Sequence, residues 1–263
     1  MYRKFFKRFI DIVGSLCGLI VLSPFLLIFA ILVRIKLGSP IIFKQCRPGK
    51  DGKVFVIYKF RSMSNAKDKD GNLLPDKDRF TKFGNFLRKT SIDELPQLLN
   101  ILKGDMSIVG PRPRDIKDAI FYGPEVKSLS VRPGLTGESQ VYGRNENSWD
   151  QIFEHDKKYA ENINFFHDMK IIFMTIPAVL GSRGAEKDKS DAKKYSYKWY
   201  ADQLLDEGKI TQEQYDAGVE SANLIKDAYL KHKEQLYPGN KVLQENDYKL
   251  PNVEEVKEKL GNK

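Results

Sequence analysis

The sequence predicts an α+β fold that is mainly helical and carries a membrane-embedded N-terminus. Three observations support this prediction: a long apolar run near the start, two short segments rich in β-branched and aromatic residues, and several later stretches with helical patterning. The 263 residues are 41% hydrophobic and 30% charged, so the chain is long enough for a buried core. This composition fits neither a disordered chain nor a polytopic membrane protein.

The first element is a run of 22 uncharged residues from Ile12 to Val33. At ~1.5 Å per residue, a continuous helix of this run would just span a bilayer. Basic residues flank both ends, which favours the cytoplasmic side for each of them. Ser23-Pro24 lies near the middle, where proline removes a backbone hydrogen bond and bends a helix. We predict a re-entrant helix broken at Ser23-Pro24, with Asp11 among lipid headgroups; a spanning helix and a buried core helix are the alternatives.

The charge distribution is strongly asymmetric. The formal net charge is +9, and residues 1–60 alone contain 11 basic and 2 acidic side chains, whereas residues 187–263 are close to neutral. A positive electrostatic field of this kind at the N-terminus favours the binding of phosphate groups in lipids, nucleotides or nucleic acids. The two cysteines, Cys17 and Cys46, lie in no CxxC pattern and beside no histidine cluster, which excludes a disulfide scaffold and a zinc module.

A β-hairpin and further helices are expected after the apolar run. Residues 41–46 and 53–60 read as two strands joined by a glycine-bearing loop over 47–52. A helical stretch follows over 95–102, and residues 149–163 and 165–180 read as two more helices. The last of these is apolar and amphipathic, so we expect it to lie flat on a membrane.

Past residue 184 the composition becomes rich in lysine and acidic residues. Gly208 is placed to stop one helix, and Thr211 with Gln214 matches a capping box that starts the next. We therefore predict a helical appendage over 187–263. It contains no reactive cluster of side chains, so partner binding or self-association is the expected role.

Two adjacent carboxylates, Asp93 and Glu94, precede the helix predicted over 95–102. Pro96 is tolerated only in a first helical turn, so this helix should begin near the pair, with Asp93 as a plausible N-cap. One interpretation is purely structural, because Ser91 and Glu94 have the spacing of a capping box. The other is catalytic: neighbouring side chains point about 100° apart, so one carboxylate could attack phosphorus while the other holds Mg²⁺. Arg88 would then supply a bidentate phosphate clamp.

Several motifs occur in the order seen in one enzyme family. The sequence contains Arg47-Pro48-Gly49, Tyr58-Lys59-Phe60-Arg61-Ser62-Met63, Asp93-Glu94-Leu95-Pro96-Gln97, Gly104-Asp105-Met106-Ser107, Val109-Gly110-Pro111-Arg112-Pro113, Arg132-Pro133-Gly134 and Gln140 with Gly143-Arg144-Asn145. In these motifs the chain resembles the bacterial sugar transferases, the monotopic polyprenyl-phosphate phosphoglycosyl transferases. The resemblance covers residues 1 to about 184. The small catalytic part is most similar to transferases that pass diacetylbacillosamine phosphate to undecaprenyl phosphate.

The resemblance implies a fold, a reaction and a location. It implies a re-entrant helix over 1–36, a catalytic domain over 37–186 and an extension over 187–263 to which nothing carries over. It implies that Asp93 is a covalent nucleophile and that Glu94 is associated with Mg²⁺. A sugar 1-phosphate would pass from a UDP-sugar, expected to be an N-acetylated amino sugar, through Asp93 to a polyprenyl phosphate, with release of UMP. The implied location is the cytoplasmic face of the bacterial inner membrane, in contact with its lipids.

Further binding residues follow from charge and motif position together. These expected contacts to the substrate are Lys59, Arg88, Arg112, Gln140, Arg144 and Asn145. Arg112 stands between two prolines, whose stiff backbone can aim a guanidinium at a diphosphate. Asp156 and Asp168 match acidic family positions and are second-tier candidates. The histidines at 155, 167 and 232 have no metal-ligand spacing and are interpreted as structural.

Other function classes explain fewer of these observations. A hexose-1-phosphate transferase of the same family is an open alternative, because the sugar pocket cannot be read from the sequence. A non-catalytic scaffold on a membrane surface accounts for the charge and the appendage, but not for Asp93 and Glu94 within ordered motifs. A nucleic-acid binder is supported only by the basic pI of about 9.3, so no nucleic-acid partner is expected. The absence of GxGxxG and GxxxxGK[ST] argues against dinucleotide and P-loop sites.

Overall fold

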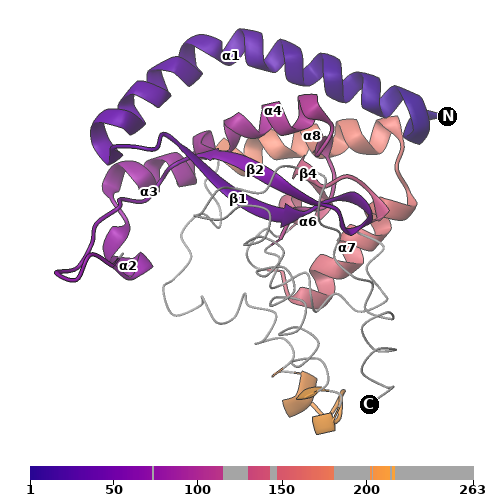
Figure 1. Cartoon of the computed structure of the whole chain (residues 1–263). Helices are drawn as coiled ribbons and strands as arrows, with labels where there is room; N and C mark the ends of the chain where they lie inside the picture. The colour runs from indigo at the N-terminus through magenta and orange to yellow at the C-terminus, as the bar shows by residue number, and fades with distance from the viewer. Residues whose placement is uncertain are drawn as a thin grey trace.

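The computed structural model describes residues 1–72, 74–114, 130–142, 147–180, 202, 204–213, 215 and 216. A short π-helical turn, η1 (Tyr2–Phe6), leads into the long helix α1 (Lys7–Leu37), which arches over the other elements (Figure 1). Below it lie the other strands and helices of the described chain. In chain order, these elements are β1 (Ile42–Pro48), η2 (Lys50–Gly52), β2 (Val54–Phe60), α2 (Asp76–Arg79), α3 (Lys82–Lys89), η3 (Ile92–Gln97), α4 (Leu98–Lys103), β3 (Ser107–Val109), β4 (Gly134–Thr136), α6 (Glu138–Val141), α7 (Trp149–Glu161) and α8 (Phe165–Leu180).

Helix α1 is bent but not interrupted at the predicted break. Pro24 lies inside a single helix from Lys7 to Leu37, so the expectation of a broken helix is wrong in its literal form. The physical reason is local compensation. Pro24 has no N–H to give to the carbonyl of Ile20, four residues earlier, and the Ser23 hydroxyl donates to that carbonyl at 2.7 Å instead. The helix therefore continues and curves (Figure 1).

The N-terminal part of α1 is anchored by polar contacts. Asp11 is buried, and its Oδ1 accepts hydrogen bonds from the Ser107 hydroxyl at 3.0 Å and from the Ile108 N–H at 2.9 Å. The prediction that Asp11 lies among lipid headgroups is therefore wrong, because its side chain points to β3. Arg8 donates to two carbonyls at the C-terminal end of α4, at 2.6 and 2.8 Å. These contacts satisfy carbonyls that a helix end leaves unpaired, and they fix α1 to the fold.

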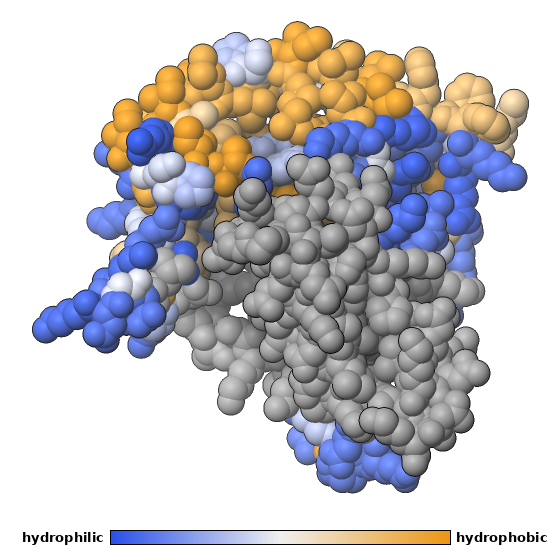
Figure 2. Space-filling model, in the orientation of Figure 1, coloured by the Kyte–Doolittle hydropathy of each residue, from blue (hydrophilic) through white to orange (hydrophobic). Residues whose placement is uncertain are grey.

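The outer face of α1 is apolar and exposed. Tyr2–Leu37 is the one helical stretch in the described part of the chain that is long and apolar enough to cross a membrane. Figure 2 shows a hydrophobic band over α1, while much of the described surface below it is hydrophilic. The exposed apolar residues of this stretch include Phe9, Leu16, Ile20, Phe25, Leu27 and Ile31. An apolar surface of this extent is typical of contact with lipid, so the protein associates with a membrane.

The predicted hairpin is confirmed. β1 and β2 pair antiparallel, from Ile42 opposite Phe60 to Pro48 opposite Val54. Asp51, at the tip, has a φ of 56°, in the left-handed region that tight turns use. Four consecutive residues of β2, Val54 to Ile57, are buried, because this strand lies between β1 and the helical segment η3 with α4. The hairpin therefore brings the end of β2 next to the predicted carboxylate pair.

A second, parallel pair of short strands depends on glycine. Ser107 and Val109 of β3 lie opposite Gly134 and Thr136 of β4. A Cβ built on Gly134 would lie 2.1 Å from the backbone nitrogen of Gly110. Two backbones can approach this closely only without a side chain between them. In the Gly- and Pro-rich motifs around these positions, glycine is therefore needed for the two strands to pack together.

The two helices predicted over 149–163 and 165–180 are confirmed as α7 and α8. The Ser148 side chain and Gln151 form a reciprocal capping box at the start of α7. On α8, Phe166, Phe173 and Ile176 are exposed large apolar residues, while Ile171 is completely buried. The expected amphipathic character of α8 is thus present.

Little of the C-terminal segment is described. Gly208 has a positive φ of 67° after a helical turn, and the Lys209 N–H bonds to the carbonyl of Leu204, so the predicted helix stop is confirmed. A new helical turn follows Thr211, whose carbonyl accepts the Tyr215 N–H. The rest of the predicted appendage, including Gln214, lies outside the described residues.

Candidate active site

The two predicted catalytic carboxylates lie on η3, a 3₁₀ segment that precedes α4. Ser91, before this segment, has a φ of 57° and makes no side-chain capping bond. The capping-box interpretation is therefore wrong, and Asp93 is not an N-cap but a residue inside the segment. The regular α-helix begins only at Leu98, later than predicted. The tight 3₁₀ turn leaves the side chains of both acids available for contacts outside their own helix.

Glu94 is held by two cationic side chains. Lys59 Nζ lies 2.7 Å and Arg112 Nη2 lies 2.8 Å from the same oxygen, Glu94 Oε1. Burial by itself would raise the pKa of Glu94, but the charges of Arg112 and Lys59 outweigh it and lower that pKa. Glu94 is consequently a carboxylate throughout the physiological range. Among the described residues, its second oxygen takes part in no hydrogen bond.

Asp93 is buried without such partners. It is 8% exposed, and within the described part of the chain its carboxylate accepts no hydrogen bond. Burial, followed by the charge of Glu94, raises the pKa of Asp93 to about 6, against the opposing charges of Lys59 and Arg112. At pH 7 to 8 most molecules therefore carry a poorly stabilised carboxylate, the state in which an oxygen is a good nucleophile.

The two cations reach Glu94 from separate elements. Lys59 is the penultimate residue of β2, and Arg112 follows β3 between two prolines. Arg61, two residues after Lys59, is buried instead and donates to the carbonyls of Leu37 and Ser39. The structure thus separates two residues that the motif places together: Lys59 contacts the acidic pair, whereas Arg61 holds the end of α1.

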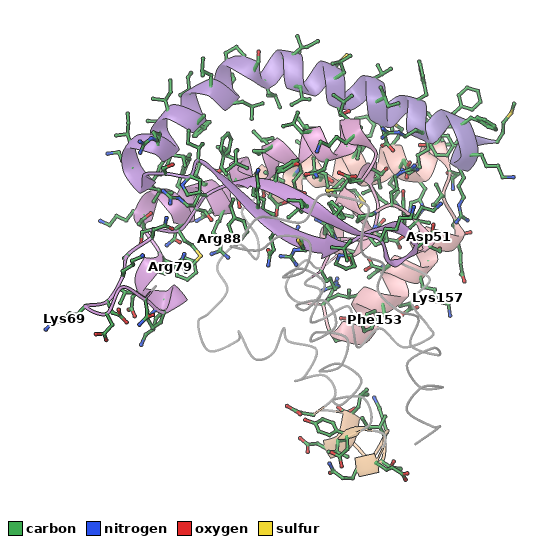
Figure 3. All side chains as sticks on the ribbon, viewed as in Figure 1. Asp51, Lys69, Arg79, Arg88, Phe153 and Lys157 are labelled. Carbon is green, nitrogen blue, oxygen red and sulfur yellow. The ribbon has the colours of Figure 1, made fainter. Side chains whose placement is uncertain are left out.

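Arg88 is placed differently from the other predicted cations. It is exposed, and its guanidinium lies 4.9 Å from the centre of the Phe80 ring. Its charge nevertheless helps to lower the pKa of Asp93. Figure 3 shows Arg88 and Arg79 on the side of the molecule away from α1. Arg88 therefore stands near the acidic pair on the side away from α1, without a direct bond to it among the described contacts.

The predicted nucleotide contacts are only partly described. Gln140 Nε2 donates to the carbonyl of Leu135 at 3.2 Å, and its Oε1 is buried without a hydrogen-bond partner among the described residues. An unpaired buried acceptor of this kind is uncommon and suits a ligand donor. Arg144 and Asn145 lie outside the described residues, so their predicted roles stay predictions.

The two second-tier aspartates lie in separate polar clusters. Asp156 is buried and accepts the Ser139 hydroxyl at 2.8 Å, and burial is the main cause that raises its pKa to about 6. Asp168 is 2% exposed and receives hydrogen bonds from Tyr2, Lys7 and Tyr159 at 2.6 to 2.8 Å. The contacts of Asp168 therefore anchor the start of α1 and do not reach the acidic pair.

Comparison with known proteins identifies the family. The model of the bacterial sugar transferase family matches residues 2–182. The chain belongs to the bacterial sugar transferase family. It is 47% identical over 182 residues to the uncharacterized sugar transferase EpsL of Bacillus subtilis, covering 69% of this chain and 90% of that protein.

Relatives with named substrates are longer. The chain is 40% identical over 186 residues to the UDP-glucose:undecaprenyl-phosphate glucose-1-phosphate transferase of Klebsiella pneumoniae, covering 65% of this chain and 39% of that protein. It is 37% identical over 190 residues to the UDP-N-acetylgalactosamine-undecaprenyl-phosphate N-acetylgalactosaminephosphotransferase of Aeromonas hydrophila, covering 69% and 45%. The chain spans less than half the length of these two relatives.

The acidic pair also fits the expected magnesium ion. Mg²⁺ takes oxygen ligands and is usually held by one or two carboxylates together with substrate phosphates. Asp93 and the second oxygen of Glu94, neither of which is hydrogen-bonded among the described residues, supply such oxygens. The described residues contain no group of three or more acidic, histidine or cysteine side chains placed to hold a metal alone. An ion held by these two carboxylates would take its remaining oxygen ligands from substrate phosphates and water.

Sequence reasoning missed several residues that organise this candidate site. Asn100 is completely buried and bonds to β2 at two points, next to Lys59. Tyr159 reaches both Asp168 and the carbonyl of Val109, the residue that begins the Val-Gly-Pro-Arg motif. Polar residues within apolar patterns, such as Asn100 among leucines, were the available signal, because a buried amide has to be hydrogen-bonded.

Proposed function

We propose that this bacterial sugar transferase moves a sugar 1-phosphate from a UDP-sugar to a polyprenyl phosphate through a covalent intermediate on Asp93. The observation that carries the proposal is the contrast within the acidic pair. Glu94 is paired with two cations, while Asp93 is buried, accepts no hydrogen bond from the described residues and has a raised pKa. A carboxylate left without hydrogen bonds beside fixed positive charges is suited to attack an electrophile that itself carries negative charge.

The reaction balances as two displacements at phosphorus. In the first, an Asp93 carboxylate oxygen forms a bond to the phosphorus that carries the sugar, and the bond from that phosphorus to the bridging oxygen breaks, releasing UMP. In the second, an oxygen of the polyprenyl phosphate attacks the acyl phosphate and Asp93 leaves as a carboxylate. The anomeric carbon takes part in neither step, so its configuration is retained.

Lys59 and Arg112 are the groups that stabilise negative charge in this scheme. Both lie within 2.8 Å of Glu94, so their positions are fixed before a substrate enters. Fixed cations cost little reorganisation when charge develops on a transferring phosphoryl group. Arg88, which is exposed near the acidic pair, is a proposed contact to the nucleotide. Gln140, whose buried Oε1 has no partner among the described residues, is a further proposed contact to the donor.

Magnesium is the proposed cofactor, held by Glu94 with Asp93. When bound, Mg²⁺ would neutralise part of the diphosphate charge and make UMP a better leaving group. Removing divalent cations with a chelator is therefore expected to stop UMP release, and adding Mg²⁺ is expected to restore it. Activity that persists unchanged in excess chelator would contradict this assignment.

Membrane association supports a lipid acceptor. The exposed apolar face of α1 and the exposed phenylalanines of α8 would place the protein at the surface of a bilayer. Basic residues at both ends of α1 favour the cytoplasmic face of the inner membrane and a re-entrant rather than a spanning arrangement. One site could then meet a water-soluble nucleotide and a lipid phosphate.

An N-acetylated amino sugar is the proposed donor sugar. One relative of known name takes UDP-N-acetylgalactosamine, which supports this class. A hexose is the second candidate, because other relatives are named for glucose and galactose transfer. The first measurement is therefore UMP release from a panel of UDP-sugars with Mg²⁺ and undecaprenyl phosphate in detergent.

The same assay tests the covalent step. Without lipid acceptor, the protein should release about one UMP per active site and then stop, and Asp93→Asn should release none. Asp51→Asn is the matched control, because this exposed aspartate lies at the tip of the hairpin. If folded protein released no UMP with any donor, a non-catalytic scaffold would replace the transferase interpretation.

A further inference from the structure

Asn100 stands where a third strand would otherwise pair with the hairpin. β1 occupies one edge of β2, and the other edge faces η3 and α4. On that free edge, Asn100 Nδ2 donates to the carbonyl of Val56 at 2.6 Å, and the Tyr58 N–H donates to Asn100 Oδ1 at 3.0 Å. The side-chain amide thus reproduces the donor and acceptor of a neighbouring strand.

The same amide ties β2 to the element that carries the acidic pair. Asn100 is 0% exposed and belongs to α4, which continues directly from η3. Its Nδ2 also donates to Asp105 Oδ2 at 3.2 Å, and its backbone carbonyl accepts the Gly104 N–H at the end of α4. Both ends of the amide and the helix turn beneath it are therefore fixed, so Asn100 has little freedom to move.

Lys59 directly follows Tyr58 and bonds to Glu94 at 2.7 Å. We propose that Asn100 is a positioning residue of the transferase, whose amide sets β2 against η3 so that Lys59 reaches Glu94 beside the nucleophile. The inference rests on the proposed function, because it assumes that the position of Lys59 beside Glu94 matters for catalysis. Small displacements of a group that stabilises charge cost much activity, up to about 100-fold for 1 Å.

The test is a double-mutant cycle on kcat/KM for UMP release. Asn100→Ala should lower kcat/KM about 10- to 100-fold in the native background, and less than about twofold when Lys59 is already alanine. Ile101→Val is the matched control, because Ile101 is the next residue, is equally buried and makes no side-chain bond to β2. Equal losses from Asn100→Ala in both backgrounds would overturn the inference and indicate a general structural role.

A split between kcat and KM supplies a second readout. Lys59 lies beside the acidic pair, so moving it should lower kcat in Asn100→Ala and change the KM for the UDP-sugar by less than about twofold, whereas Ile101→Val should change neither. A loss confined to KM in a folded Asn100 variant would overturn the inference.

Two outcomes separate this inference from the proposed function. If Lys59→Ala alone leaves kcat/KM unchanged, the proposed role of Lys59 fails and the inference with it. If Lys59→Ala lowers kcat/KM but the cycle is additive, only the inference fails. Should Asn100→Ala not fold, Asn100→Gln replaces it in the cycle, because glutamine keeps the amide but places it one methylene further from the backbone.

Discussion

Asp93 and Asp168 are two buried aspartates with opposite surroundings. Asp168 is 2% exposed, and three donors from Tyr2, Lys7 and Tyr159 use both of its oxygens. Asp93 is 8% exposed and accepts no hydrogen bond among the described residues. Burial of a carboxylate is costly unless it is paired, so only the first arrangement serves the fold. In this protein, the hydrogen-bond partners of a buried aspartate, more than its burial, therefore distinguish a structural residue from a candidate catalytic one.

Replacing Asp93 is the largest expected effect on activity. Asp93→Asn should reduce UMP release about 1,000-fold or more, since an amide cannot form the acyl phosphate. Stability should not fall with it. The pKa of Asp93 is raised from 3.8 to about 6, so its charged form destabilises the fold; this cost grows between these two pH values and stays constant above pH 6. Asp93→Asn should therefore melt at or above the native temperature at pH 8, which thermal unfolding in detergent will measure.

Replacing Asp168 should produce the opposite pattern. Asp168→Ala leaves Lys7, which is only 12% exposed, without its partner, so the free energy of unfolding should fall by about 3–5 kcal/mol. Denaturant unfolding in detergent measures this loss. The double variant Lys7→Met with Asp168→Leu should recover part of it, because no charge is then left unpaired. A folded Asp168→Ala protein with full stability but no activity would contradict the comparison.

The pH dependence sharpens the comparison further. Because Asp93 has to be ionised to attack, kcat/KM should fall about tenfold per pH unit below an apparent pKa near 6. Glu94 stays charged across this range, so it contributes no limb of its own. Initial rates of UMP release between pH 5 and 8 test this, with the unfolding temperature followed in parallel. A limb near pH 4 would indicate that Asp93 has hydrogen bonds that the described contacts lack.

Local patterns were sufficient for much of the fold. The apolar run, the hairpin and the helices over 149–163 and 165–180 follow from side-chain periodicity and turn residues, and each is present. The motif order also identified the residues that meet: Lys59 and Arg112 both contact Glu94. These residues are far apart in the sequence, so their proximity was implied by the resemblance and not by spacing.

Two of the errors share one physical cause, which is that tertiary contacts override local rules. Asp11 has the spacing of an interfacial acid, but it bonds to Ser107 and Ile108 of a distant strand. Ser91 and Glu94 have the spacing of a capping box, yet Glu94 is drawn to Lys59 and Arg112 instead. In each case a partner more than ten residues away in sequence offers the side chain a stronger bond than the local one.

The smallest expected effect concerns a polar group freed inside the apolar helix α1. Ser23 donates to the Ile20 carbonyl that Pro24 leaves without an N–H. Ser23→Ala should therefore lower the free energy of unfolding by about 1 kcal/mol, measured in detergent or nanodiscs. Adding Pro24→Ala restores the N–H, so the same serine replacement should then cost almost nothing. If Ser23→Ala lowered the free energy of unfolding equally with alanine and with proline at position 24, the hydroxyl would not be compensating for the missing N–H. The continuity of α1 would then need another cause.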